Sequence, residues 1–397
     1  MKTVFDLRDK QDDEIYHAIQ GLYNEPLQVV KLVGESITAC IGCWSCWLKT
    51  PGRCAMKDEM VKSYPRYVNS DTVILLMDTA QGFINHKAKA FFDRTIPHYH
   101  PYIEMVGGEC HHVARYKSYP DMVFLFDTDG LTKKEEQVIE DYLYRTAYHF
   151  KAKAYRIVKE GSLKLRTLEE RKAKRQSVPF ASSKPAEKLV IYNGSPRRGG
   201  GNSALILKKV VEALGDRVEV RDLKESGKWE EWAESFQREK DVMFFMPLYV
   251  HAMPSHVMGF MEKLPASEGS ISFFVQSGFP ESSQSHYLEA YFEQLALRLG
   301  RAYLGTAIKG GVESLRMRPV QAQDQMIAPL VKAIENVVHE GSFNSTDIDR
   351  LARPIRYGKG MGILFNLVGK KIINFFWDQQ LKANDAYKQS FDMPYFS

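Results

Sequence analysis

Short apolar runs alternate with amphipathic stretches along most of the chain, and this pattern predicts an α/β protein. In the first half the apolar runs predict strands over 3–7, 27–33, 72–77, 122–126 and 154–158. Apolar residues at helical spacing predict helices over 12–22, 88–96 and 132–150. Strands that alternate with helices in this way are typical of a doubly wound parallel sheet.

The second half repeats the pattern. Its predicted strands cover 189–192, 218–223, 241–246, 271–275 and 302–308. Its helices are predicted over 229–236, 288–299 and 321–338, with another helix beginning near Ala204. We therefore expect two doubly wound parallel-sheet domains, over 1–160 and 188–341, joined by a linker over 161–187 whose first part can be helical.

A helical extension is predicted over 342–397. Within Met361–Leu381 the apolar residues at helical spacing are Leu364, Phe365, Val368, Ile372, Phe375 and Phe376. Lys370 and Lys371 interrupt this stripe, which makes it too polar to span a bilayer. It could lie on a membrane surface or cover a partner subunit, but packing on its own domain is the commonest use of such a stripe.

Composition and charge narrow the function classes. Of 397 residues, 44% are apolar and 26% are charged, and the net charge of +5 is too small to argue for nucleic-acid binding. The N-terminal residues contain no apolar signal region, and no run of eighteen apolar residues predicts a spanning helix. Four of the five cysteines lie between Cys40 and Cys54, which favours a reducing cytoplasm over a disulfide framework.

The residues 188–203, KLVIYNGSPRRGGGNS, predict a strand, a Gly/Ser-rich loop and a helix capped by Asn202 or Ser203. Backbone N–H groups in the loop, the helix N-terminus and the hydroxyls of Ser195 and Ser203 would bind a phosphate, and Arg197 or Arg198 would match its charge. The loop has neither the Gly-Lys-Ser/Thr of a Walker A motif nor the Gly-x-Gly-x-x-Gly dinucleotide fingerprint. The alternative is an ordinary Gly-rich turn.

Asn-Gly-Ser-Pro-Arg followed by Gly-Asn-Ser resembles the FMN-phosphate loop of flavodoxin-like NAD(P)H-dependent FMN reductases and iron–sulfur flavoproteins. Two later stretches, Pro-Leu-Tyr-Val and Ser-Gly-Phe-Pro-Glu, resemble the segments that hold the flavin ring in that family. The resemblance implies an FMN site made of Ser195, Pro196, Arg197, Asn202, Ser203, Pro247, Leu248, Tyr249, Val250, Ser277, Gly278 and Phe279.

The first half lacks a comparable loop. After its first strand come residues 6–14, DLRDKQDDE, which contain no glycine and five acidic residues. This composition would repel a phosphate, so we expect FMN to bind only in the second half.

Instead, the first half carries Cys40, Cys43, Cys46 and Cys54 in the spacing C-x2-C-x2-C-x7-C. Four thiolates can hold a [4Fe–4S] cluster or a zinc ion, or the cysteines can be plain thiols in an apolar wall. The stretch from Cys40 to Met60 resembles the cysteine motif of iron–sulfur flavoproteins and also that of related reductases that need no cluster.

Two further segments of the first half bear on chemistry. Asp78–Arg94 resembles the family's flavin-edge loop and the helix after it, with Phe91, Asp93 and Arg94 matching the helix end. Thr79-Ala80-Gln81 replaces the usual Pro-x-Tyr. A second cluster could bind zinc or be a polar surface loop packed against aromatic residues, and we expect the loop; it comprises His98, His100, Cys110, His111 and His112.

The resemblance implies a tandem fusion of two flavodoxin-like units that form an intramolecular pseudo-dimer, with the Trp/Cys segment or the Gln81–Phe83 loop near a single FMN. The expected activity is FMN-dependent NAD(P)H oxidoreduction, with a small-molecule or protein electron acceptor and no separate general base. Alternatives are an iron–sulfur electron carrier without NAD(P)H turnover and a non-enzymatic scaffold. The sequence also leaves open whether the pseudo-dimer assembles into a homo-oligomer.

Overall fold

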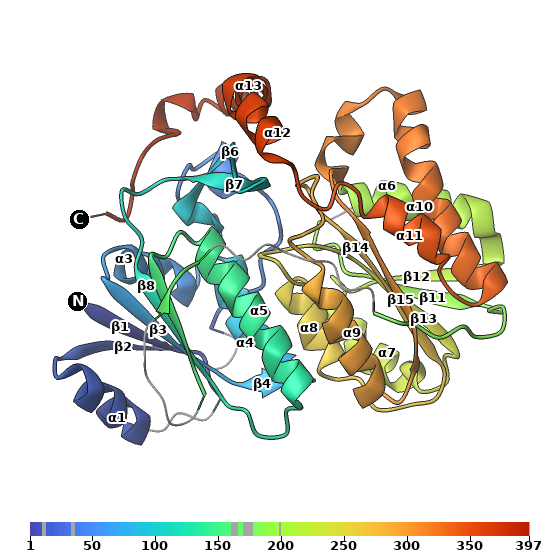
Figure 1. Cartoon of the computed structure of the whole chain (residues 1–397), viewed down its shortest axis with the longest axis horizontal. Coiled ribbons are helices and arrows are strands. Elements are labelled where there is room, and N and C mark those ends of the chain that lie inside the picture. The colour runs from blue at the N-terminus through green and yellow to red at the C-terminus, as the bar shows by residue number, and fades with distance from the viewer. Residues whose placement is uncertain (10–12, 33–35, 160–165, 170–177, 198–199, 397) are drawn as a thin grey trace. The chain divides into compact units, whose positions relative to one another are not determined.

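The computed structural model describes residues 1–9, 13–32, 36–159, 166–169, 178–197 and 200–396 (Figure 1). The chain divides into two compact units. The first comprises Met1–Leu131, Ile139–Arg171 and Gly358–Ser397, and the second comprises Thr132–Val138 and Lys172–Tyr357.

The first unit contains a sheet with the strand order β10-β9-β8-β3-β1-β2. Its strands are β1 (Lys2–Asp6), β2 (Leu27–Lys31), β3 (Thr72–Met77), β8 (Asp121–Phe126), β9 (Ala154–Val158) and β10 (Arg166–Thr167). All pair in parallel except the short edge strand β10, so the five parallel strands follow the order 2-1-3-4-5 of flavodoxin-like folds.

The two faces of this sheet pack against different helices because side chains alternate along each strand. Val4 lies in a core cluster with Tyr16 and Ile19 of α1 (Asp13–Tyr23). Phe5 contacts Tyr67 and Phe91 on the opposite face. The helices on that face are α3 (Glu59–Val68), α4 (His86–Asp93) and α5 (Lys133–His149).

Residues 99–114 form a β-hairpin of β6 (Tyr99–Val106) and β7 (Glu109–Ala114). Our expectation of a polar surface loop here is wrong, because His98, His100, Cys110 and His111 are all buried. Aromatic partners explain this burial. His98, for example, stacks on Tyr67 with ring centroids 4.8 Å apart. Smaller elements of the unit are α2 (Ser45–Leu48), β4 (Thr79–Ala80) and β5 (Phe83–Ile84).

The second unit has a purely parallel sheet with the order β12-β11-β13-β14-β15, again 2-1-3-4-5. Its strands are β11 (Leu189–Asn193), β12 (Val218–Asp222), β13 (Asp241–Pro247), β14 (Ser270–Gln276) and β15 (Ala302–Lys309). One side carries α6 (Asn202–Leu214), α10 (Val320–Glu340) and α11 (Ser345–Leu351) (Figure 1). The other carries α7 (Trp229–Phe236), α8 (Ser255–Met261) and α9 (Tyr287–Arg298). The predicted fold class is thus confirmed.

Two adjacent residues of β13 show how this sheet separates its cores. Phe244 stacks with Tyr192 and Phe273 on the α8/α9 side. Phe245 belongs to the cluster under α6 and α10 and stacks with Phe274, with ring centroids 4.8 Å apart.

The predicted linker and extension are distributed over both units. Residues 161–165 and 170–177, including the stretch that we expected to be helical, lie outside the described residues. Ala181 and Ala186 donate backbone hydrogen bonds to Tyr303 and Val338 of the second unit. Helix α11 packs against β15, whereas Gly358–Ser397 belongs to the first unit.

The end of the chain forms α12 (Lys359–Leu364), a π-helical turn (Phe365–Gly369) and α13 (Lys370–Ala383). The expectation that its apolar stripe packs on its own domain is wrong for most of the stripe. Leu364, Val368, Ile372 and Phe375 are each more than half exposed, because polar residues of the helix make the contacts with β6.

Replacing Phe245, which is fully buried, by alanine removes the stacked ring from the core under α6. We expect the free energy of unfolding of the second unit to fall by about 3–5 kcal/mol. Urea denaturation followed by circular dichroism measures it. Leu297→Ala on α9 is the control: its side chain is 67% exposed, so the change should be small. Equal losses in both variants would contradict the assigned core.

Candidate functional site

The turn between β11 and α6 is fixed by side-chain and backbone hydrogen bonds. Asn193 accepts a bond from the Ser195 N–H at 3.1 Å through Oδ1 and donates one to Asp222 at 2.6 Å through Nδ2. Gly194 N–H donates to the Phe245 carbonyl, and a Cβ at Gly194 would lie 2.6 Å from Val257 Cγ2. This contact requires glycine, so the strand end and the loop after it have little freedom.

Helix α6 begins at Asn202 with Gly201 as its N-cap, and no described side chain caps it. The predicted cap by Asn202 or Ser203 is wrong. Asn202 Nδ2 instead donates to the Val312 carbonyl at 2.8 Å, and Ser203 Oγ accepts a bond from Gln276. The helix therefore presents its N-terminal turn, with its partial positive charge, to the space beside the loop.

An open pocket lies beside this helix end, with a volume of ≈ 440 Å³ counted out to open solvent. Nine of the twelve predicted residues line it: Ser195, Arg197, Asn202, Ser203, Pro247, Leu248, Tyr249, Ser277 and Gly278. Pro196, Val250 and Phe279 are not among the lining residues. The predicted loop residues Arg198 and Gly199 lie outside the described part of the chain.

Four lining residues were not predicted as ligands: Gly201, Gln276, Val312 and Glu313. The sequence signal for them was their position, because Gln276 ends β14 and Val312 and Glu313 follow β15. The carboxyl ends of parallel strands meet at one sheet edge, so loops after successive strands converge there.

One cation and one carboxylate face each other in the pocket. Arg197 Nη1 lies 3.9 Å from Glu313 Oε1. Burial raises the pKa of Glu313, although Arg197 counteracts the rise. An incoming anion would compete with this carboxylate for the guanidinium.

The polar groups of the pocket suit a phosphate ester on a hydroxylated chain. Ser195 and Ser203 supply hydroxyls, and α6 supplies backbone N–H groups. Asn202 Oδ1 is buried and has no hydrogen-bond partner among the described residues, so it could accept a bond from a ligand hydroxyl. A Cβ at Gly201 would lie 3.2 Å from Ser195 Oγ, so glycine keeps the loop open. These groups fit FMN.

The rim of the pocket includes a strained turn. Tyr249 and Ala252 exchange backbone hydrogen bonds, and the two residues between them, Val250 and His251, have φ values of 38° and 63°. Positive φ is costly for a β-branched residue such as valine. Tyr287 donates a hydrogen bond to the His251 carbonyl and supports the turn. Such strain at a pocket rim is typical of ligand-contacting backbone.

The cysteine segment of the first unit is not assembled as a metal site. Cys46 is buried with Trp47 and Trp377, whereas Cys43 is exposed. Among the described residues, the four cysteines do not form a group of potential metal ligands. Burial raises the pKa of the Cys40 thiol to about 12 and that of Cys46 well above its ordinary value, so both are protonated thiols at neutral pH.

Buried charges hold this segment in place. The Arg94 guanidinium donates to both carboxylate oxygens of Asp58, at 2.7 and 2.9 Å, and to the Thr38 carbonyl at 2.7 Å. Lys89 and Asp93, which are one turn apart on α4, form a second buried ion pair. The motif residues Asp58, Asp93 and Arg94 thus take part in two ion pairs within the first unit.

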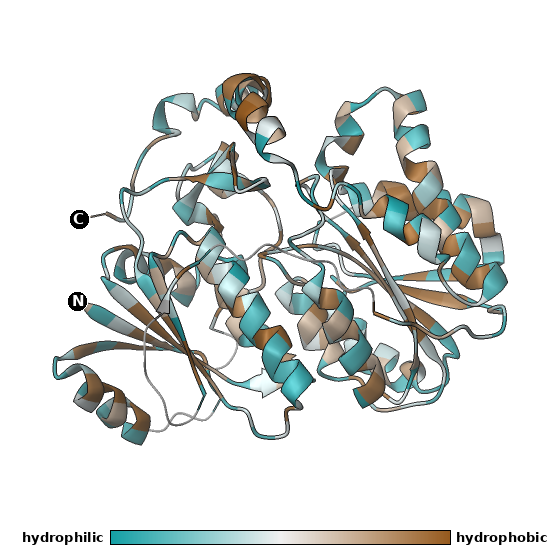
Figure 2. Ribbon diagram, in the orientation of Figure 1, coloured by the Kyte–Doolittle hydropathy of each residue, from teal (hydrophilic) through white to brown (hydrophobic). Residues whose placement is uncertain are grey.

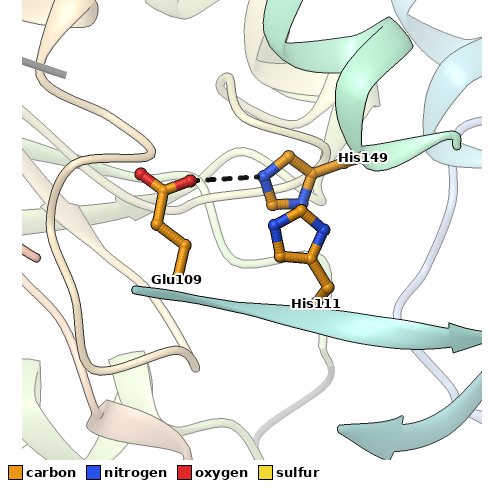
Figure 3. Close-up of side chains that lie close together, drawn as sticks. All are labelled: Glu109, His111 and His149. Atoms are coloured by element: carbon orange, nitrogen blue, oxygen red, sulfur yellow. Dashed lines mark ion pairs between the residues drawn. The ribbon is translucent and has the colours of Figure 1, made fainter. Parts of the chain in front are cut away.

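The group of three potential metal ligands that the described residues do bring together is Glu109, His111 and His149 (Figure 3). The two imidazole rings are stacked, with centroids 3.9 Å apart and an interplanar angle of 7°. Nitrogen lone pairs lie in the ring planes, so parallel rings cannot aim two of them at one ion about 2.1 Å away. Arg145 also holds Glu109 through both carboxylate oxygens. This arrangement is a buried ion pair beside stacked rings.

The end of β1 carries its own anion. The buried Asp6 carboxylate accepts hydrogen bonds from Arg8 at 3.0 and 2.7 Å and from Tyr16 at 2.5 Å. Lys87 pairs with Asp9 in the loop after β1. That this half binds no phosphate stays a prediction from the sequence.

Comparison with known proteins found no matching family model and no matching curated protein. Solved structures do match over part of the chain. An NADPH-quinone reductase from P. pentosaceus is 14% identical over 36% of this chain and 94% of its own, with a TM-score of 0.29. An FMN-dependent NADH-azoreductase from Bacillus anthracis, in complex with FMN, is 14% identical over 38% and 100%, also at 0.29. General stress protein 14 from Treponema denticola, in complex with FMN, is 13% identical over 37% and 99%, at 0.29.

Similarity at this level carries no argument about activity. The two strand orders themselves place the chain in the flavodoxin-like α/β class. No helix in the described part of the chain is both long and apolar enough to cross a membrane.

Burial in the first unit, together with the nearby Arg115, lowers the pKa of His98 to about 3. Unfolded histidine titrates near pH 6.5, so between these values the unfolded chain binds a proton that the folded chain does not. Stability should therefore fall as the pH falls below about 6.5. In His98→Phe the free energy of unfolding should fall less steeply with decreasing pH, by about 1.4 kcal/mol per pH unit.

Urea unfolding at a series of pH values measures the effect. His17→Phe on α1, where the histidine is exposed, is the control and should follow the parent chain. If His98→Phe showed the same pH dependence as the parent, a neutral buried His98 would be excluded.

Proposed function

We propose that the protein is an FMN-dependent NAD(P)H oxidoreductase whose flavin binds in the second unit. The observation that carries this proposal is the pocket at the N-terminus of α6, where nine independently predicted residues from three strand-end loops come together. A phosphate-binding helix end next to two further loops at the carboxyl edge of a 2-1-3-4-5 sheet is the arrangement that suits a mononucleotide.

In this proposal, different residues of the pocket contact different parts of FMN. Ser195, Ser203, Arg197 and the first turn of α6 hold the phosphate, and Asn202 Oδ1 accepts from a ribityl hydroxyl. The two later loops border the ring: Pro247, Leu248 and Tyr249 from one, Ser277 and Gly278 from the other. Bound FMN would accept a hydride from NAD(P)H and pass electrons to a small-molecule or protein acceptor.

The other hypotheses receive less support. The cysteines of the described chain are not gathered as ligands, so no observation favours the iron–sulfur carrier. The intramolecular pseudo-dimer and a cytoplasmic location stay predictions from the sequence.

Arg197→Glu tests the phosphate site. The substitution removes a charge-assisted hydrogen bond and adds repulsion, so FMN should bind about 100-fold more weakly. Riboflavin, which has no phosphate, should bind within about threefold of its affinity for the parent chain. Quenching of flavin fluorescence on titration measures both affinities.

Arg238→Glu is the matched control, because this exposed arginine follows α7 in the same unit and lies outside the pocket. It should leave both affinities unchanged. Failure of the parent chain to bind FMN, or equal weakening of FMN and riboflavin in Arg197→Glu, would refute the proposed site. Oxidation of NADH and NADPH by the FMN-loaded parent chain then tests the activity.

Glu313→Gln should strengthen FMN binding at pH 8 by about three- to tenfold, because it removes a carboxylate that repels the phosphate and competes for Arg197. The pKa of Glu313 is raised, so the parent carboxyl becomes neutral as the pH falls through that value. The advantage of the variant should therefore shrink at lower pH.

FMN dissociation constants are measured for the parent chain and for Glu313→Gln at several pH values. Protonation of the FMN phosphate affects both constants alike, so it cancels in their ratio. Glu268→Gln, at an exposed position of the same unit, should show no advantage at any pH. A ratio for Glu313→Gln that is constant across the pH range would mean that this carboxylate does not act on the phosphate.

A further inference from the structure

The helical segment 359–383 is attached to the β6–β7 hairpin by polar side chains. Asn366 accepts a hydrogen bond from the Met105 N–H at 3.0 Å and donates one to the Met105 carbonyl at 2.9 Å. Asn374 accepts from the Ile103 N–H at 3.0 Å. These contacts fix which face of the segment turns toward its own unit.

Near its end the segment is anchored more deeply. Trp377 packs edge-on against Trp44 and Trp47, with ring centroids 5.3 and 5.7 Å apart, and Leu381 is fully buried. Tyr102 donates a hydrogen bond to Asp378 at 2.6 Å. The helix therefore cannot rotate without breaking several buried contacts.

The opposite face is apolar, and Figure 2 shows hydrophobic positions in brown on the segment from α12 to α13. The outward residues and their exposed fractions are Ile363 63%, Leu364 55%, Leu367 65%, Val368 52%, Ile372 68% and Phe375 60%. Helices on soluble domains normally turn their apolar stripe inward. Here most of the stripe faces outward, while Asn366, Asn374 and Trp377 face the protein, which marks an interaction surface.

The charge of the segment indicates what covers this face. Residues 359–383 contain four lysines and one acidic residue, Asp378. Lys370 and Lys371 lie in the middle of the apolar stretch, where long side chains can place their ammonium groups beside the face. Apolar residues flanked by lysines are typical of helices that lie in the plane of an anionic membrane surface.

A second copy of the chain fits this face less well. In a two-fold symmetric pair, the lysine-rich stretch of one copy would meet the same stretch of the other, which brings like charges together at an apolar contact. We propose that the outward face of residues 361–375 binds membranes rich in anionic phospholipid. The proposal does not depend on the flavin site.

Co-sedimentation of the full chain with phosphatidylcholine vesicles, with and without phosphatidylglycerol, tests it. The parent chain should bind the phosphatidylglycerol vesicles, and added salt should weaken binding. Leu367→Glu with Ile372→Glu should reduce binding at least about tenfold. Lys370→Gln with Lys371→Gln should reduce it about ten- to thirtyfold.

Leu297→Glu is the control, because Leu297 is an equally exposed leucine on α9. This variant should bind vesicles like the parent chain. Circular dichroism checks that each variant folds. Parent chain that stays in the supernatant with both kinds of vesicle would overturn the proposal. So would a stable dimer that the paired glutamates convert to monomer without any vesicle binding, since that result assigns the face to a second copy.

Discussion

The first turn of an α-helix has N–H groups that the helix itself cannot pair, and at α6 this constraint organises the second unit. The side chains that could have capped the helix are used elsewhere: Asn202 bonds the loop after β15, and Ser203 bonds Gln276 at the end of β14. The end of β14 and the loop after β15 are thereby tied to one helix end. The same bonds that shape the pocket leave its positive end open to an anion.

The first unit has the same strand order, but the end of its first strand carries a different side chain with different partners. Asp6 lies at the end of β1, in the position that Asn193 occupies at the end of β11. Its carboxylate accepts hydrogen bonds from Arg8 and Tyr16, so the positive charge of Arg8 near this strand end is already paired with Asp6. The same strand order thus appears twice, once with the neutral Asn193 at the end of the first strand and once with the ion-paired Asp6 there.

Most strands and the composition of the pocket could be predicted because they depend on local sequence. Apolar runs such as residues 241–246 must be buried, and loops after parallel strands must meet at one edge. The β6–β7 hairpin could not be predicted, because its histidines are buried only by partners distant in sequence, such as Tyr67 for His98. The orientation of α13 was missed for a related reason. The apolar period locates a helix face, but the hydrogen bonds of Asn366 and Asn374 decide which way it turns.

Those two asparagines have a consequence for the strand beneath them. An unpaired strand edge is a template on which another chain can add a strand. Asn366 occupies both backbone groups of Met105, and Asn374 occupies the N–H of Ile103, so β6 offers few positions for such growth. The helix thus protects the hairpin from edge-to-edge aggregation. Truncation of the chain before residue 359 would expose an unpaired edge of β6 on which another chain could add a strand.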